Sequence, residues 1–453
     1  MVAVSRRIAF LVLNVLDDSN AFPEHLLHRA FEREPQLIRK DRALATDLVY
    51  GVLRWRGRLD WVIRRLSKTP AHKIDPPVLN ILRLGLYQIL FHSRIPPSAV
   101  VNDSVEMTKW QAPFWVVRFV NGVMRSAARK AKEIPLPDYN DDPVQAIVVR
   151  ESHPLWLVER WVERLGIEET KQLCKANNQI PPVTVRANTL KVSREQLLNS
   201  LTDHVRQITL TKFAPDGLSL KGFGNAVADI PSFKDGWFQV QDEAAQLITH
   251  LLDPEPGEVI LDACAGFGGK TGHIAQLMDD RGKIKAMEYR SWKLRRLETS
   301  LTRLGISSVT TWDHDLSVSV PVAPSGAFDR ILLDAPCSGL GVLRRNPDAK
   351  WKKTEMDLTR LRGDQLRFLF SIAPLVKKGG RLVYCVCSLE PEEGDYVVEE
   401  FLKNQTQFVI DQEPVGLLDM DKHLVDNSGF FRSSPHEHDM DGFFAVRLKR
   451  TTI

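Results

Sequence analysis

Cysteine is scarce in this chain of 453 residues, and its spacing excludes the usual cysteine-based frameworks. The five cysteines form no Cys-x-x-Cys pair and have no histidine partner at zinc-finger spacing, so we expect neither disulfides nor a bound metal. Reduced thiols are typical of the cytoplasm, which is the expected location. The cysteines are Cys174, Cys264, Cys337, Cys385 and Cys387.

Long apolar runs are also missing, since no stretch approaches the ~20 residues that a membrane-spanning helix needs. Arg6 and Arg7 precede an apolar run over residues 8–16 and imitate a twin-arginine export signal. Asn14 interrupts that run, two aspartates close it, and no small-residue cleavage site follows. We therefore expect an ordinary first helix and no membrane partner.

The charge of the chain is distributed unevenly. Its net charge is +4, but residues 1–130 hold 21 basic and 11 acidic residues, which gives +10 there and −6 in the remainder. A basic front part favours a polyanionic partner, most simply a nucleic acid.

The pattern of apolar residues predicts several domains, because single cores stop growing at roughly 250 to 300 residues. Apolar positions three and four apart predict helices almost throughout residues 4–131, and a Pro-, Asp- and Asn-rich linker covers 134–142. We predict an all-α domain over 1–135, a small α+β domain over 145–235 and an α/β domain over 236–453.

The C-terminal part alternates between strand and helix patterns, which is typical of a doubly wound, Rossmann-like parallel sheet. Ligands of such sheets bind at the carboxyl ends of the strands. Helices are expected over 291–304 and 354–376. The expected strands cover 259–265, 283–289, 309–313, 328–335 and 381–389, with a final strand over 442–448.

A glycine-rich turn from Asp262 to Thr271 follows the first of these strands and opens a helix. Three ligands compete for it. Gly269-Lys270-Thr271 fits a phosphate-binding P-loop, but Cys264 stands where its first glycine belongs. The second candidate is a dinucleotide, but the turn holds only the first half of the dinucleotide-binding fingerprint. The third candidate is S-adenosylmethionine. Glu288 ends the next strand, where a carboxylate can accept hydrogen bonds from both ribose hydroxyls of an adenosine.

Two further strands end in cysteines. Asp334-Ala335-Pro336-Cys337 follows one strand, and Cys385-Val386-Cys387 ends another. A single strand-end cysteine is more often a small buried apolar residue. A pair beside an aspartate suits methyl transfer to C5 of a pyrimidine, a carbon that becomes nucleophilic only after a thiolate adds to C6. Asp334 can hydrogen-bond the base as charge moves into its ring.

The motifs resemble those of the bacterial Sun/Fmu (RsmB-like) RNA cytosine-5 methyltransferases, which modify small-subunit (16S) ribosomal RNA. The likeness rests on residues 262–271, on residues 334–339 continuing into 344–351, and on the Cys-Ser-x-x-Pro-Glu-Glu motif at 387–393. It implies Cys387 as the nucleophile, Cys337 as the residue that assists release, and S-adenosylmethionine as the cofactor. The implied cofactor contacts are Cys264, Ala265, Gly266, Phe267, Gly268, Gly269, Lys270, Glu288, Asp315 and Asp334.

The resemblance extends to the front end, where residues 41–43 and 51–55 look like a NusB-like RNA-binding domain. It implies ribosomal RNA as the partner of a monomer, with transfer RNA as the alternative substrate. The chain departs from the family at Gly266-Phe267, where Ala-Pro is usual, and at Val386, where Thr is usual. We expect these changes to affect the affinity for the cofactor and the reaction rate more than the type of reaction.

RNA contacts are predicted where arginines interleave with tryptophans and downstream of Cys337, although such runs are usually solvated surface. A non-catalytic RNA-binding assembly factor and a P-loop nucleotide enzyme are the competing functions. His436 and His438 are expected on a loop rather than at a metal site. The predicted RNA contacts are Arg54, Arg56, Arg58, Arg344, Arg345 and Lys350.

Overall fold

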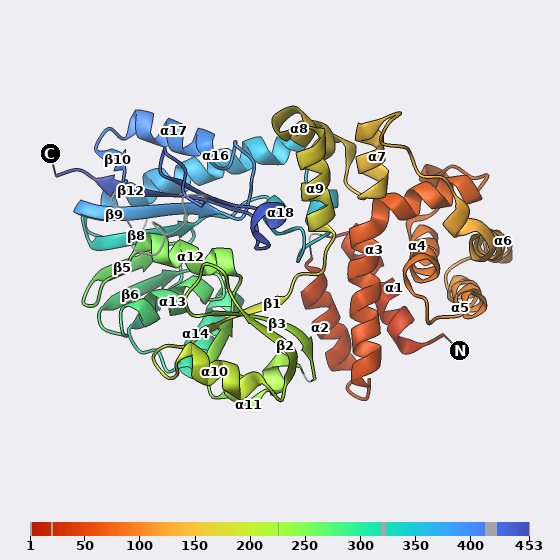
Figure 1. Ribbon diagram of the computed structural model, residues 1–453, viewed down its shortest axis with the longest axis horizontal. Helices are drawn as coiled ribbons and strands as arrows, with labels where there is room; N and C mark the ends of the chain where they lie inside the picture. Colours follow the sequence, from red (N-terminus) through yellow and green to blue (C-terminus); the bar gives the residue numbers. More distant parts are fainter. Residues whose placement is uncertain (1, 20, 225, 319–322, 413–423, 453) are drawn as a thin grey trace. The chain divides into compact units, whose positions relative to one another are not determined.

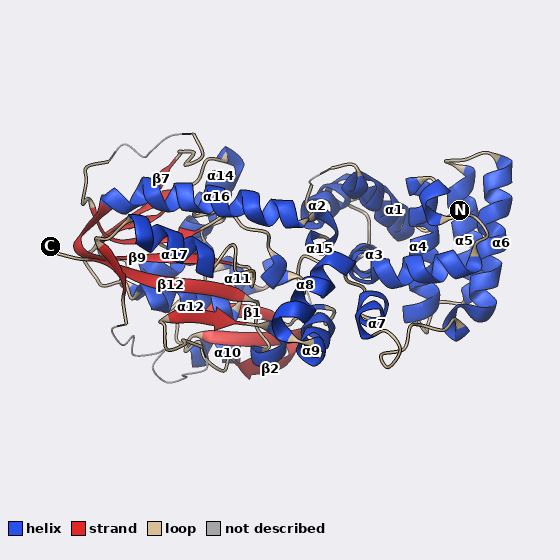
Figure 2. Ribbon diagram, turned by 90° about the horizontal axis from the view of Figure 1, so that it is seen from above, coloured by secondary structure: helices blue, strands red, loops and turns tan. Residues whose placement is uncertain are grey.

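The computed structural model describes the whole chain except residues 1, 20, 225, 319–322, 413–423 and 453. The described residues form two compact units, one of residues 1–179 and 346–352 and the other of 180–345 and 353–453. The first unit is helical, and every described strand belongs to the second (Figure 2). Residues 145–179, expected with the α+β domain, group with the helical unit.

The helical unit is built on amphipathic helices whose apolar sides meet in one core. Prolines occupy the first turn of α2, α4, α5 and α7, where their missing N–H groups cost nothing. Leu48, Ile81 and Met124 are fully buried in this core. The helices are α1 (Val4–Asp17), α2 (Pro23–Arg33), α3 (Arg39–Leu66), α4 (Pro76–Phe91), α5 (Pro97–Lys109), α6 (Phe114–Lys130), α7 (Pro143–Arg150), α8 (Leu155–Leu165), α9 (Ile167–Asn177) and α15 (Ala349–Lys352).

A small antiparallel sheet begins the second unit. Its strand order is β2-β3-β1-β4, and α10 and α11 complete a β-α-β-β-α-β succession, which is a ferredoxin-like arrangement. A capping box at Ser193 starts α10. The elements are β1 (Val183–Ala187), α10 (Arg194–Leu201), β2 (Val205–Leu210), β3 (Gly217–Phe223), α11 (Pro231–Lys234) and β4 (Phe238–Val240).

A larger mixed sheet follows, with the order β10-β12-β9-β8-β5-β6-β7 and with β11 paired to β12. Strands β5 to β9 run parallel, and β12 is antiparallel to β9, so the Rossmann-like fold is confirmed. The strands are β5 (Val259–Asp262), β6 (Lys283–Met287), β7 (Val309–Trp312), β8 (Phe328–Asp334), β9 (Val376–Val386), β10 (Phe408–Ile410), β11 (Phe430–Ser433) and β12 (Phe443–Arg450).

Helices cover both faces of this sheet, with α12, α13 and α14 on one side and α16 and α17 on the other (Figure 1). Successive residues of β8 alternate between the two layers, because Leu332 packs with the first set and Ile331 and Leu333 with the second. The helices are α12 (Glu243–Leu252), α13 (Gly269–Leu277), α14 (Ser291–Leu304), α16 (Glu355–Ile372), α17 (Asp395–Asn404) and α18 (Pro435–His438).

The secondary structure differs from the prediction at two places. His436 and His438 lie in the short helix α18 instead of a loop. Strand β9 begins five residues earlier than expected, because its glycines at 379 and 380 continue the strand. Among the described helices, none has the length and apolar character needed to cross a bilayer.

Candidate active site

The larger sheet has a switch point at β5 and β8. From β5 the chain proceeds outward through β6 and β7, and from β8 it proceeds in the opposite direction through β9. In open α/β sheets the crevice at the carboxyl ends of such neighbouring strands binds the ligand. The loops after β5, β6, β8 and β9 carry the predicted cofactor residues and cysteines to this edge.

The loop after β5 is shaped by backbone that only glycine adopts readily. Gly266 and Gly268 have φ of 57° and 82°, and a Cβ on Gly268 would lie 2.8 Å from Leu297. Gly266 faces open space, so a ligand can approach the backbone there. Thr271 donates to the buried Asp262 at 2.6 Å, which fixes the start of α13 to the end of β5.

Carboxylates surround this loop. Glu288, at the end of β6, is nearly buried, accepts from the backbone N–H of Arg290 at 3.0 Å and pairs with Lys293 at 3.2 Å. Asp315, after β7, accepts a hydrogen bond from Ser317, which lowers the pKa of its carboxyl group. A backbone opened by glycine beside a strand-end carboxylate fits an adenosine-containing cofactor without a phosphate.

Lys270 is directed at Asp334 instead of at open solvent. Its Nζ lies 2.7 Å from Asp334 Oδ2, and the Cys385 thiol donates to Asp334 Oδ1 at 3.4 Å. Although burial opposes the charge, Asp334 raises the pKa of Lys270 above its ordinary value. Lys270 therefore orients the Asp334 carboxylate, which we expected to contact the base.

The two cysteines predicted to react lie side by side. Cys337 Sγ is 3.1 Å from Cys387 Sγ, and both residues are half-buried, whereas Cys385 is fully buried. The hydrogen bond to Cys387, together with burial, raises the pKa of Cys337 well above its ordinary value. Cys337 therefore stays protonated, and its S–H can donate to the sulfur of Cys387.

A buried glutamate holds the two cysteine loops together. Glu393 accepts hydrogen bonds from the backbone N–H of Ser338 at 2.7 Å, from the Ser338 hydroxyl, and from Gln365 Nε2 at 3.1 Å. The hydroxyls of Ser338 and Ser388 lie 3.2 Å apart. Each serine directly follows one of the two cysteines, so this network sets their separation. The sequence motif contained Glu393, but nothing in it indicated this role.

Replacing Glu393 with alanine is expected to lower the free energy of unfolding by about 3 kcal/mol, since three buried donors lose their acceptor. The rate of methyl transfer should fall on the order of 10- to 100-fold, because the two sulfur atoms are no longer held together. Denaturant unfolding and initial rates measured on the folded fraction check this. The matched control is Glu399→Ala, an exposed site on α17. Equal effects of the two substitutions would contradict a clamping role.

Several residues that we predicted to contact RNA have partners within the protein. Arg54 is buried, and Arg344 is 3% exposed and pairs with Asp439 at 2.7 Å. Lys350 is 1% exposed, donates to the backbone oxygen of Arg54 at 3.0 Å, and has its pKa lowered by burial to about 7. Arg345 binds Asp242 and Asp441 at 2.7 and 2.8 Å. These cations pair with carboxylates and carbonyls of the protein itself.

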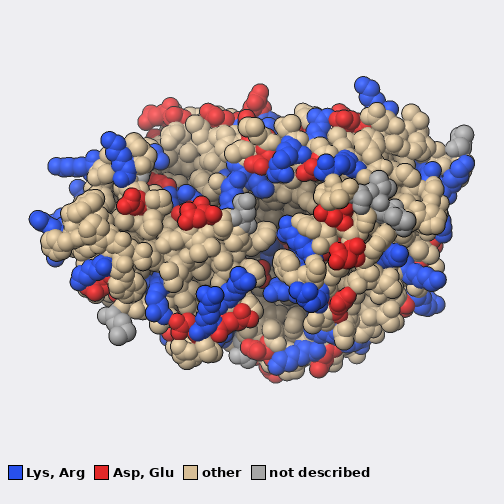
Figure 3. Space-filling model, turned by 180° about the vertical axis from the view of Figure 1, so that it is seen from behind, with Lys and Arg blue, Asp and Glu red and all other residues tan. Residues whose placement is uncertain are grey.

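Arg56 and Arg58 are half-buried. Arg56 pairs with Asp17 at 3.3 Å, and Arg58 lies over the rings of Trp55 and Phe91. Lys, Arg, Asp and Glu are interspersed over the face drawn in Figure 3, so charge there does not mark a binding stripe.

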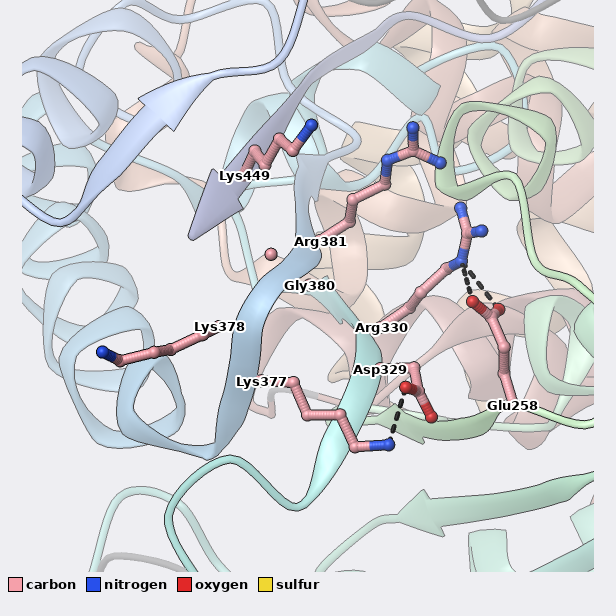
Figure 4. Close-up of a pocket in the computed structure, with 9 residues that line it drawn as sticks. Glu258, Asp329, Arg330, Lys377, Lys378, Gly380, Arg381 and Lys449 are labelled. Carbon is pink, nitrogen blue, oxygen red and sulfur yellow. Dashed lines mark hydrogen bonds and ion pairs between the residues drawn. The ribbon is translucent and has the colours of Figure 1, made fainter. Parts of the chain in front are cut away.

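A basic pocket lies at the opposite, amino-terminal edge of the same strands (Figure 4). Arg330 there pairs with Glu258 at 2.7 Å, Lys377 with Asp329 at 2.6 Å, and Arg381 with Asp253 at 2.9 Å. These ion pairs join the starts of β5, β8 and β9, so we assign them to sheet stability and not to ligand binding.

Comparison with known proteins gives a match to each part of the chain. Residues 249–449 match the family described as 16S rRNA methyltransferase RsmB/F, residues 3–129 match the NusB family, and residues 153–226 match an RsmF/B-like ferredoxin-like domain.

Individual relatives cover the chain almost completely. The chain is 37% identical to the probable ribosomal RNA small subunit methyltransferase B of Synechocystis sp., over 98% of this chain and 99% of that protein. It is 34% identical to the protein of the same description from Bacillus subtilis, over 98% of each. The crystal structure of PH0851 superposes with a TM-score of 0.82 at 26% identity, covering 99% of this chain and 98% of that one.

Proposed function

This chain belongs to the 16S rRNA methyltransferase RsmB/F family, and from that premise we propose that it methylates C5 of a cytosine in small-subunit ribosomal RNA. The enzyme is an S-adenosylmethionine-dependent RNA methyltransferase. The proposal rests chiefly on one observation, the 3.1 Å separation of Cys337 and Cys387 at the carboxyl edge beside Asp334.

The proposed reaction begins with the thiolate of Cys387, which forms a bond to C6 of the cytosine and moves electron density to C5. Bound S-adenosylmethionine supplies an electrophilic methyl group on its sulfonium. C5 would take that methyl group as the methyl carbon–sulfur bond breaks and its electrons stay on sulfur, which leaves a neutral thioether. Asp334, oriented by Lys270, would hydrogen-bond the base as charge develops in the ring.

Release needs two bonds to break. The proton on C5 passes to a base, and its bonding electrons re-form the C5–C6 double bond as the C6–S bond breaks. Cys387 leaves as the thiolate, and the aromatic ring is restored. Cys337, adjacent to Cys387, is placed to assist this step. The target base must leave its stack, at a cost of a few kcal/mol that is least in unpaired RNA.

The covalent step is tested with small-subunit ribosomal RNA transcripts in which 5-fluorocytidine replaces cytidine. Fluorine cannot leave C5 as a cation, so the enzyme with S-adenosylmethionine should remain bonded to the RNA and migrate as an adduct on a denaturing gel. Transfer RNA transcripts with the same substitution serve as the comparison. The absence of any adduct would contradict covalent catalysis, and an adduct with transfer RNA alone would contradict the ribosomal substrate.

A further inference from the structure

Helix α6 presents one exposed face made of aromatic and basic residues. Trp115, Arg118, Gly122, Arg125 and Arg129 recur at three- and four-residue spacing, so they lie along one side of the helix, and all five are exposed. The helix lies at the outer side of its unit, next to α5 (Figures 1 and 2). Its opposite face is buried in the core through Val116, Val120, Val123, Met124 and Ala127.

The charge of this face is entirely positive. No acidic residue occurs between Glu106 and Glu133. Within the described part of the chain, Arg118, Arg125 and Arg129 make no hydrogen bond or ion pair. The arginines that were expected to contact RNA, such as Arg344, lack such free guanidinium groups. Their guanidinium groups are buried, ion-paired or stacked on aromatic rings. Unpaired cations on a rigid helix suit a polyanion, which neutralises them without competition from internal carboxylates.

Large aromatic rings are exposed at Trp115 and at two residues that precede it in the chain. Phe114 is 76% exposed, Trp115 is 70% exposed and Trp110, at the end of α5, is 49% exposed. Exposing such rings to water is unfavourable unless they contact a partner. Unstacked nucleobases are suited to them, because every base offers a flat face for stacking.

We propose that this α6 face binds a single-stranded segment of the substrate RNA, with bases stacked on the aromatic rings and phosphates along the three arginines. The distance from Trp115 to Arg129 is about 21 Å at 1.5 Å per residue, enough for several nucleotides. Gly122 has nothing within 4 Å of the position of a Cβ, so the RNA backbone can approach between the cations. This inference rests on the proposed function, since it assigns the surface to the same RNA.

The test uses the full-length enzyme with Arg118, Arg125 and Arg129 all changed to glutamine, and separately Trp115→Ala. The matched control changes Arg281, Arg360 and Arg367, which are exposed but each paired to an aspartate. Binding of a fluorescent small-subunit ribosomal RNA fragment is measured by anisotropy over a range of salt concentrations, and methyl transfer is measured at varied RNA concentration.

The α6 triple variant should bind roughly 10- to 50-fold more weakly at physiological salt, and its log–log salt slope should shrink by about 2. Trp115→Ala should weaken binding about 10-fold with little change in slope. In both variants KM for RNA should rise while kcat at saturating RNA stays at the wild-type value. Wild-type binding by the triple variant, or an equal loss in the control, would overturn the assignment. Weakened binding by the α6 variants, together with a wild-type enzyme that transfers no methyl group, would contradict the proposed function and leave this surface in place.

Discussion

Cys387→Ala should lower the rate of methyl transfer by about 10⁴- to 10⁶-fold, the scale of loss when a covalent nucleophile is removed. The two neighbouring cysteines are poorly suited to replace it. Cys385 is fully buried and donates to Asp334, and in the variant, which lacks the hydrogen bond from residue 387, burial still raises the pKa of Cys337. The variant should also form no adduct with RNA containing 5-fluorocytidine, while binding S-adenosylmethionine as the wild type does.

Calorimetry measures the binding of S-adenosylmethionine, and a denaturing gel with the fluorinated RNA measures adduct formation independently. Cys174→Ala is the matched control, because that cysteine belongs to the helical unit and is distant in sequence from every motif. It should keep both the rate and the adduct. An adduct that persists in Cys387→Ala would exclude this cysteine as the nucleophile, whatever the residual activity.

The sequence predicted regular elements best where one hydrophobic period runs without interruption. Helix α14 begins and ends at the expected residues. The predicted strands β5 and β8 extended too far at their carboxyl ends. The residues there are still apolar or small, but they belong to the loops at the ligand-binding edge and not to the hydrogen-bonded strands. Composition alone does not separate these two uses.

Long-range partners of charged side chains could not be predicted. Lys350 and Arg344 belong to a basic run that is typical of solvated surface, yet each meets an acceptor that lies far away in the sequence. Glu393 was likewise visible only as part of a motif, because its function depends on Ser338 and Gln365, which come from other elements. The sequence could predict that Cys337 and Cys387 lie near each other, since they follow two neighbouring parallel strands.

The pKa of Cys337 depends on the state of its partner, and this suggests when it acts. The hydrogen bond with Cys387 is the largest cause of its raised pKa, with burial next. Once Cys387 is bonded to C6, its sulfur is a thioether and that hydrogen bond is weakened. Cys337 then becomes easier to deprotonate, at the stage of the reaction when a base is needed to complete release.

Cys337→Ala should therefore block the reaction after methyl transfer and before release. We expect turnover to fall by about 10²- to 10⁴-fold, the range of a lost general acid–base group, while an adduct with unmodified RNA accumulates to nearly one RNA per enzyme. S-adenosylmethionine labelled on its methyl group distinguishes the stage, because the adduct on the gel should carry the label. Cys337→Ser, which keeps a smaller and less acidic hydroxyl, should accumulate less adduct. Wild-type turnover in Cys337→Ala would contradict the release role. An unlabelled adduct would place the block before methyl transfer, and Cys337 would then act by positioning the nucleophile Cys387.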